Sequence, residues 1–189
     1  MTEHTLEAAR LDIVDALREA ATKKDSPLRS PVFATVDDDG SPQARVVILR
    51  DFDPSEMVLR VFTDSRSPKV GQLKSTPQAQ LVFYDRNRQL HFRVSGTTTL
   101  HIGDALTRTL WPELPEFGRG DYLSRQPPGS GIADPTEGWQ LDETFGSENF
   151  TVIELKIYHV DWLKLSASGH KRAQLTWRDG RCDGKWVTP

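Results

Sequence analysis

A cluster of cations and hydroxyls lies between apolar segments in the first half of the chain. Its members are Arg45, Thr63, Ser65, Arg66, Ser67 and Lys69. A dianionic phosphate needs several charge-assisted donors that converge from a rigid frame, and such residues supply them. Ser67 followed by Pro68 is typical of a helix start, where free backbone N–H groups would point at the same anion. The cluster predicts a phosphate site, and the alternative is a set of solvated turn charges.

The segments around this cluster are predicted to be β-strands. Arg45 opens an apolar segment that ends at Arg50, and a second apolar segment ends at Phe62 and Thr63. β-branched and aromatic runs separated by turn signals are typical of short antiparallel strands. The predicted strands are residues 32–36, 43–50, 57–63, 80–84, 89–96, 150–156, 160–165, 172–177 and 185–187. Turns are predicted at residues 37–40, 85–87, 178–180 and 183–184.

One long helix is expected over residues 5–23. Its apolar residues recur at helical spacing and form a stripe that must pack on another element: Leu6, Ala9, Ile13, Leu17 and Ala20. Residues 67–75 and 103–110 are predicted to be short helices. Residues 112–148 hold five prolines and show no clear periodicity. A segment of this length predicts a functional loop or lid.

Together these elements predict a mostly β, α+β fold. The expected architecture is a closed or nearly closed barrel of antiparallel strands, with a long N-terminal helix and short additional helices. A doubly wound parallel sheet is disfavoured, because strands and helices do not alternate and no Gly-x-Gly-x-x-Gly turn occurs. One domain over residues 1–189 is the simplest organisation, with residues 1–26 as its helical start.

Charge and cysteine content exclude several classes of partner. The net charge is −3 and the pI is about 6.0, which disfavours nucleic acid and anionic membranes. An oligonucleotide-binding barrel would also need a basic, aromatic-studded sheet face. Cys182 is the only cysteine, so an intrachain disulfide and a cysteine-based metal cluster are excluded. With no signal pattern and no apolar run of about 18 residues, we expect a soluble protein of the reducing cytoplasm.

The order of these motifs resembles the pyridoxamine 5′-phosphate oxidase family, the FMN-binding split β-barrels. The resemblance covers nearly the whole chain after residue 30. Five short motifs carry it: the strand from Arg45 through Val46 and Ile48 to Arg50, the phosphate-binding turn with Phe62-Thr63 and Ser67 with Lys69, Arg88-Gln89, Ser124-Arg125-Gln126, and Trp162 with Arg172. Each motif alone is common, but their shared order is hard to obtain by chance.

The resemblance implies an FMN-binding homodimer with the flavin at the subunit interface. One protomer would hold the phosphate, ribityl chain and ring through Arg45, Arg50, Thr63, Ser67, Lys69 and Gln89. The other protomer would contribute Gln126, Trp162 and Arg172. A cation near the flavin N1 stabilises the reduced, anionic form, and Arg172 is the candidate for that charge. The alternatives are a surface cation for Arg172 and a core position for Trp162.

The substrate half of the site departs from the family pattern. The oxidase has an arginine-x-histidine pair where this chain has Ser168-Gly169-His170, so the histidine is present and the arginine is not. The family's tyrosine, arginine and serine clamp on the substrate phosphate falls on Thr109, Glu113 and Phe117. A glutamate in place of a phosphate-binding arginine repels that phosphate.

The phosphate-binding turn departs from the family pattern at one position. Pro68 stands where the family has a basic residue, and Arg66 is the nearby cation that can compensate. The flavin half of the site is therefore expected to be kept and the substrate half to be rebuilt.

The favoured reading is an FMN-dependent oxidoreductase that passes hydride through the flavin N5 to or from another small molecule. His170 is the candidate acid/base or substrate contact. Two alternatives stay open. The first is a genuine pyridoxamine/pyridoxine 5′-phosphate oxidase, and the second is a non-catalytic flavin-, deazaflavin- or haem-binding split barrel.

Overall fold

The computed structural model describes residues 5–142 and 146–189. In these ranges nine strands form one antiparallel sheet. The strands are β1 (Val32–Val36), β2 (Pro42–Val46), β3 (Leu49–Asp53), β4 (Val58–Asp64), β5 (Gln78–Asp85), β6 (Leu90–Ile102), β7 (Phe150–Lys164), β8 (Lys171–Arg178) and β9 (Arg181–Val187). Their order is β2-β1-β5-β6-β7-β4-β3, with β8 paired to β7 and β9 to β8. The predicted fold class is confirmed, although the sheet is not closed.

Three strand predictions were wrong in detail. The predicted strand over residues 43–50 is two strands, because β2 pairs with β1 whereas β3 pairs with β4. The backbone changes partner at Val47, whose N–H donates to the carbonyl of Pro31 at 3.0 Å. Residues 150–156 and 160–165 belong to the single strand β7, which pairs with the long strand β6. Residues 183–184 lie inside β9 and not in a turn.

Three helices occupy the positions predicted for them, and a fourth, α4, lies within the segment predicted as a long loop. The helices are α1 (Leu6–Thr22), α2 (Pro68–Ser75), α3 (Ala105–Leu110) and α4 (Glu116–Arg119). Shorter 3-10 turns are η1 (Pro27–Arg29), η2 (Trp111–Glu113), η3 (Gly120–Tyr122), η4 (Pro135–Trp139) and η5 (Ser147–Asn149). The hydroxyl of Thr5 caps α1 by accepting from the N–H of Ala8 at 3.1 Å. No helix of the described ranges is long and apolar enough to cross a membrane.

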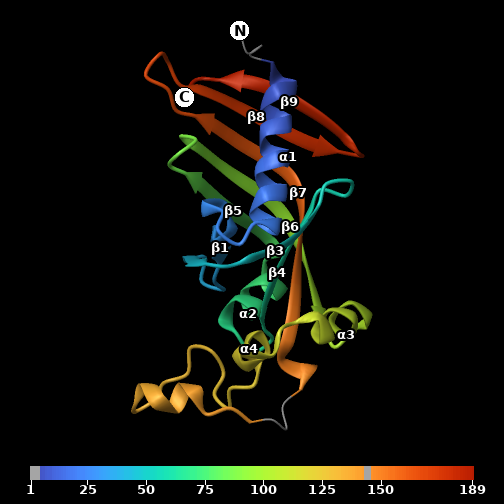
Figure 1. Ribbon diagram of the computed structural model, residues 1–189, viewed down its shortest axis with the longest axis vertical. Coiled ribbons are helices and arrows are strands. Elements are labelled where there is room, and N and C mark those ends of the chain that lie inside the picture. The colour runs from blue at the N-terminus through green and yellow to red at the C-terminus, as the bar shows by residue number, and fades with distance from the viewer. Residues whose placement is uncertain (1–4, 143–145) are drawn as a thin grey trace.

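The predicted long loop gathers at one end of the molecule. Figure 1 shows α4 and the segment after it below α2, away from β8, β9 and the start of α1. Within the described part of residues 112–148, short helical turns and an isolated bridge between Ser124 and Leu141 give the segment its shape. A separate apolar cluster anchors this end of the fold, formed by Leu114, Tyr122, Phe150 and Val152.

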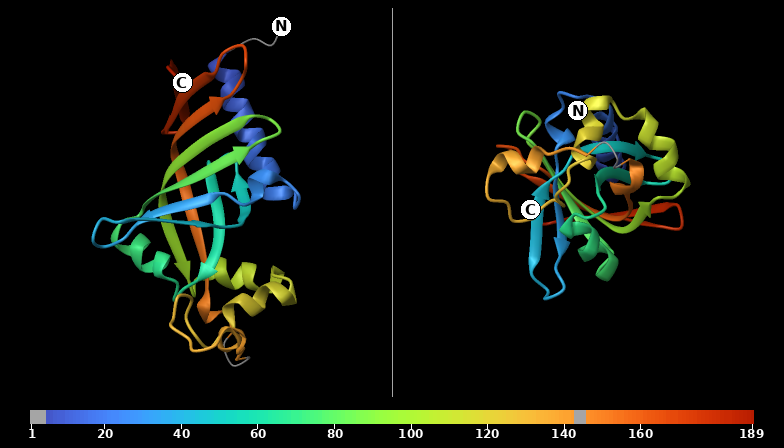
Figure 2. Two further views of the ribbon diagram at one scale, coloured as in Figure 1. Left: turned by 90° about the vertical axis from the view of Figure 1, so that its left-hand side faces the viewer. Right: turned by 90° about the horizontal axis from the view of Figure 1, so that it is seen from below.

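The two faces of the sheet differ in what covers them. The main core lies on the face that receives α1, where Phe83 and Phe92 stack with ring centroids 4.6 Å apart. α1 packs there against β3, β8 and β9 through its predicted apolar stripe. Among the described residues no element covers the other face of β2, β1 and β5, where Val32, Val46 and Tyr84 are exposed. Figure 2 shows the β1–β2 hairpin projecting away from the rest of the sheet.

Candidate functional site

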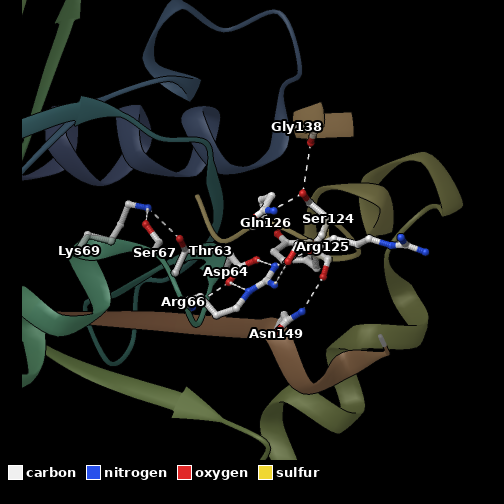
Figure 3. Close-up of polar contacts among 11 residues, drawn as sticks. Thr63, Asp64, Arg66, Ser67, Lys69, Ser124, Arg125, Gln126, Gly138 and Asn149 are labelled. Atoms are coloured by element: carbon white, nitrogen blue, oxygen red, sulfur yellow. Dashed lines mark hydrogen bonds and ion pairs between the residues drawn. The ribbon is translucent and has the colours of Figure 1, made fainter. Parts of the chain in front are cut away.

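The phosphate cluster predicted from the sequence assembles between the end of β4 and the start of α2. The ammonium of Lys69 donates to Oγ1 of Thr63 at 2.9 Å and to Oγ of Ser67 at 2.6 Å (Figure 3). Thr63 and Ser67 are 7% and 5% exposed, so their hydroxyls are oriented by the fold. Ser67 is the N-cap residue of α2, yet its side chain accepts no hydrogen bond from the helix backbone. The first turn of α2 therefore retains donors for an anion.

Arg45 reaches the same site from β2. The space between Arg45, the end of β4 and the start of α2 is called the phosphate corner below. Its guanidinium donates to Oγ1 of Thr35 at 2.5 Å and to Oε1 of Gln72 at 3.2 Å. The hydroxyl of Thr35 donates in turn to Oε1 of Gln72 at 2.6 Å. Two strands and α2 thus fix the direction of the Arg45 side chain.

The two cations of the corner, Arg45 and Lys69, have carboxylates nearby but not in direct contact, since Asp37 acts on Arg45 and Asp64 on Lys69. Within the described ranges, neither Arg45 nor Lys69 has a carboxylate at ion-pair distance. Burial lowers the pKa of Lys69, and the nearby guanidinium of Arg45 lowers it further, with Asp64 opposing both. Burial also lowers the pKa of Arg45. Two partly buried cations that repel one another favour binding of an anion between them.

Arg66 is held differently from the other two cations. It forms an ion pair with Asp64, Nη2 lying 2.7 Å from Oδ2, and Asp64 raises its pKa. Its Nη2 also donates to the carbonyl of Ser124 at 2.9 Å (Figure 3). Arg66 therefore fastens the phosphate turn to the Ser124–Gln126 segment of the same chain. Gln126 is exposed there and lines a loop cavity of about 260 Å³.

Arg50 and Phe62 lie in a second pocket, on the side of α3. The guanidinium carbon of Arg50 lies 5.6 Å from the centroid of the Phe62 ring. The pocket has a volume of about 460 Å³ and is otherwise lined by Arg29, Asp51, Arg60, Leu110, Glu113 and Leu114. Val46 and Ile48 contribute to neither pocket lining, and Val46 projects from the uncovered sheet face, where it is 63% exposed.

Trp162 and Arg172 lie on opposite faces of the sheet. The register pairs Trp162 with Ala173 and Arg172 with Leu163. The indole of Trp162 is buried under α1 and donates to Oδ2 of Asp12 at 2.9 Å. Arg172 instead binds Asp161 on the outer face, with Nε and Nη2 at 2.8 and 2.7 Å from its two carboxylate oxygens.

Gln89 and His170 lie in exposed connections next to these strands. Gln89 sits in the β5–β6 turn with φ of 51°, and its amide donates to the carbonyl of Arg86 at 2.8 Å. His170 lies between β7 and β8, and its Nδ1 accepts from the N–H of Ser166 at 3.1 Å. Figure 1 shows β8 well separated from α2 along the long axis. One chain therefore does not bring Arg172 and the phosphate corner together.

Two residues of the corner, Thr35 and Gln72, were not among the residues predicted from the sequence. The sequence contains a weak signal that could have indicated these two residues. Thr35 alternates with the exposed residues of β1, and Gln72 lies one helical turn after Lys69. Because polar residues at such buried positions need partners, they mark a site as well as the charged residues do.

Comparison with known proteins agrees with this geometry. Residues 12–102 match the family described as pyridoxamine 5′-phosphate oxidase, FMN-binding domain. The resemblance to this family that was predicted from the sequence is confirmed, and the matched domain is one that binds FMN, the predicted cofactor. The matched range contains the whole phosphate corner, from Thr35 to Gln72.

Individual relatives add detail. A pyridoxamine 5′-phosphate oxidase-related, FMN-binding protein from Nostoc punctiforme PCC 73102 has a TM-score of 0.78 and 26% identity, covering 98% of this chain and 100% of that one. PhzG from Burkholderia lata 383, in complex with tetrahydrophenazine-1-carboxylic acid, has a TM-score of 0.74, with 97% and 92% coverage. At 16% identity this similarity shows the fold alone.

A curated relative aligns over a shorter region. The pyridoxine/pyridoxamine 5′-phosphate oxidase of Microcystis aeruginosa is 44% identical over 65 residues, which are 34% of this chain and 29% of that protein. The alignment therefore spans less than a third of the relative's length.

The donors of the corner fit the phosphate of FMN. A phosphate monoester is dianionic near neutral pH and has three terminal oxygens that accept hydrogen bonds. Lys69, Arg45, the two hydroxyls and the start of α2 offer donors of matching charge and number. Each donor is held by a contact within the protein, so little ordering is needed when the anion binds.

Proposed function

We propose that this protein is an FMN-dependent oxidoreductase that transfers hydride between the flavin N5 and a small molecule other than pyridoxamine 5′-phosphate. The observation that carries the proposal is the pair Arg45 and Lys69, two partly buried cations without a carboxylate in ion-pair distance among the described residues. Their place in a family FMN-binding domain makes the flavin phosphate the anion they suit best. When bound, FMN supplies two-electron chemistry that no side chain of the protein can perform.

The residues nearest the corner have distinct roles in this proposal. Lys69 and Arg45 neutralise the phosphate, while Thr63 and Ser67 donate to its oxygens. Arg66 holds the Ser124–Gln126 segment against the same turn. Arg50 and Phe62 would contact the ribityl chain and ring. Gln89 was predicted to join them from the same protomer, but it lies beside Leu165 at the opposite end of the β6–β7 ladder, so it would reach the flavin only from the partner protomer.

The partner protomer would supply Arg172 and His170 to this site. Exposed apolar residues on the uncovered sheet face support a homodimer: Val32, Val36, Val46 and Tyr84 are 38%, 36%, 63% and 50% exposed. Such a strip on three neighbouring strands, β2, β1 and β5, favours burial against a second copy. We assign no cofactor contact to Trp162, since its indole is buried and bound to Asp12.

The pocket beside Arg50 is the proposed seat of the substrate. Phe62, Leu110 and Leu114 give it apolar walls, whereas Arg50 and Glu113 bring opposite charges. A phosphate group would meet Glu113 where the family oxidase has an arginine. Neither Thr109 nor Phe117 is in the lining, and Phe117 is 86% exposed. The pocket therefore suits a small, partly apolar molecule better than a phosphorylated vitamer.

A genuine pyridoxine/pyridoxamine 5′-phosphate oxidase is the second candidate, favoured by the curated relative described above. Both candidates share a cytoplasmic location, expected from the single cysteine. They separate in one anaerobic experiment, in which the protein is loaded with FMN and mixed with pyridoxamine 5′-phosphate. We expect the flavin absorbance to persist. Prompt bleaching would instead identify the vitamin B6 oxidase, and a purified protein with a haem spectrum and no affinity for FMN would contradict both candidates.

A further inference from the structure

Asp161 lies at the centre of an ion cluster on the outer face of the sheet. Its carboxylate accepts from Nε and Nη2 of Arg172 at 2.8 and 2.7 Å and from Nη2 of Arg93 at 2.9 Å. The side chain of Asp161 is 8% exposed, whereas those of Arg172 and Arg93 are 29% and 40% exposed. One buried carboxylate is thus shared by two arginines that face solvent in the protomer.

The cluster is continuous with the apolar strip proposed above as the dimer interface. Cross-strand partners form one row over the outer face: Val46, Val32, Val82, Arg93, Asp161, Gln174 and Lys185. Directly paired residues of an antiparallel sheet point to the same side. A second copy that covers Val46 and Val32 would therefore approach the arginines too.

The guanidinium of Arg172 uses only some of its donors in the ion pair with Asp161. Asp161 occupies its Nε and Nη2, and no hydrogen bond among the described residues engages its Nη1. A bidentate pair of this kind fixes the plane of the guanidinium, so the remaining donors have a defined direction. With Arg93 included, the three charges sum to +1.

We propose that Asp161 is a positioning residue that aims Arg172 at the FMN bound by the partner protomer and, together with Arg93, sets the positive charge there. This inference rests on the proposed function. Reduced FMN carries negative charge at its pyrimidine edge, so positive charge nearby favours the reduced form. The carboxylate of Asp161 reduces that effect, and the guanidinium of Arg93 restores part of it.

Two variants, each of which removes one charge, should therefore shift the midpoint potential of the flavin in opposite directions. Asp161→Asn keeps one oxygen that can accept from Arg172 and removes the negative charge, so we expect the affinity for reduced FMN relative to oxidised FMN to rise about tenfold. Arg93→Gln leaves the Asp161–Arg172 pair in place and lowers the cluster charge, so the same ratio should fall by a similar factor. The matched control is Glu7→Gln, which removes the carboxylate of the exposed Glu7–Arg10 pair on α1.

The measurement is the flavin midpoint potential of each FMN-loaded protein by equilibration with a dye, together with titration of oxidised FMN. Opposite shifts in the two variants and no shift in Glu7→Gln support the proposal. Normal FMN binding with unchanged potentials would overturn it and leave Asp161 as a structural ion pair. If Asp161→Asn does not fold, Arg93→Gln decides alone. A native protein that binds no FMN would overturn the proposed function as well, which is a different result.

Discussion

The guanidinium of Arg45, bound to Gln72 of α2, repels the ammonium of Lys69, which is bound to Ser67 at the start of the same helix. Burial and then Arg45 lower the pKa of Lys69 in the folded protein from 10.5. The unfolded chain therefore binds more protons between the lowered pKa and 10.5, so the stability of the apoprotein should rise with pH through this window. In the same window the affinity for FMN should fall, because the cation is lost.

Urea unfolding of the apoprotein at several alkaline pH values checks this prediction. Measurements should stay below pH 10, because burial raises the pKa of Tyr122 from 10.0 to about 12 and its unfolded-state ionisation would oppose the trend. Lys69→Met should remove the rise in stability with pH and leave the opposing trend of Cys182, whose pKa burial raises from 9.0. An equally steep slope in Lys69→Met would show that another group causes it.

Asp161 should stabilise the protein at neutral pH and lose this contribution in acid. Its hydrogen bond from Arg172, with the one from Arg93, lowers its pKa from 3.8 to about 2. This contribution is complete above pH 3.8 and is lost as the pH falls through about 2. Because both arginines are partly exposed, we expect about 1 kcal/mol. The free energy of unfolding of Asp161→Asn should therefore change less between these pH values than that of the native protein, and an identical acid dependence would contradict the assignment.

Gly96 sits at the bulge between β6 and β7 where a side chain has no room. A Cβ there would lie 2.6 Å from the carbonyl oxygen of Lys156 and would overlap the Leu155 side chain. Gly96→Ala should cost about 1–3 kcal/mol in unfolding free energy. Gly71→Ala is the matched control, because its Cβ meets nothing within 4 Å in α2 and should stabilise the protein by about 0.5–1 kcal/mol. Equal effects of the two substitutions on chemical denaturation would contradict this account.

A substitution at Val46 tests whether the protein forms the proposed dimer. Val46→Glu places a charge in the apolar strip, and light scattering after size exclusion should show a shift from dimer to monomer. FMN affinity should fall at the same time, because Arg172 would no longer reach the partner's flavin. Leu11→Glu is the control, since Leu11 is also exposed, at 47%, but lies on α1 over the other face. A monomeric native protein that binds FMN tightly would refute the dimer.

Much of the fold could be predicted from local patterns. The apolar stripe of α1 and the Ser67-Pro68 start of α2 are short-range signals, and the structure places both helices within a residue or two of the prediction. Short-range signals also located Thr63, Ser67 and Lys69, because one turn carries all three. The break at Val47 could not be predicted, since it depends on which strands β2 and β3 pair with.

The face of the sheet on which each site residue lies was harder to predict from the sequence. Trp162 and Arg172 are ten residues apart in the sequence, but a spacing across a hairpin does not determine a face until the register is known. The register puts Trp162 with Ala173 in the core and Arg172 with Leu163 outside. The role of Asp161 could not be predicted from the sequence for the same reason, because only the pairing of β6 with β7 brings Arg93 beside it.

Titration of the apoprotein with FMN, compared between Lys69→Met and Lys74→Met, tests the central claim most directly. Lys74 is an exposed lysine on the same helix, so the two variants differ in position and not in chemistry. Loss of a charged hydrogen-bond donor to phosphate costs about 1.5–3 kcal/mol. We therefore predict that Lys69→Met weakens FMN binding at least about tenfold while Lys74→Met binds like the native protein. Equal affinities for FMN in both variants would contradict the placement of the flavin phosphate at the start of α2.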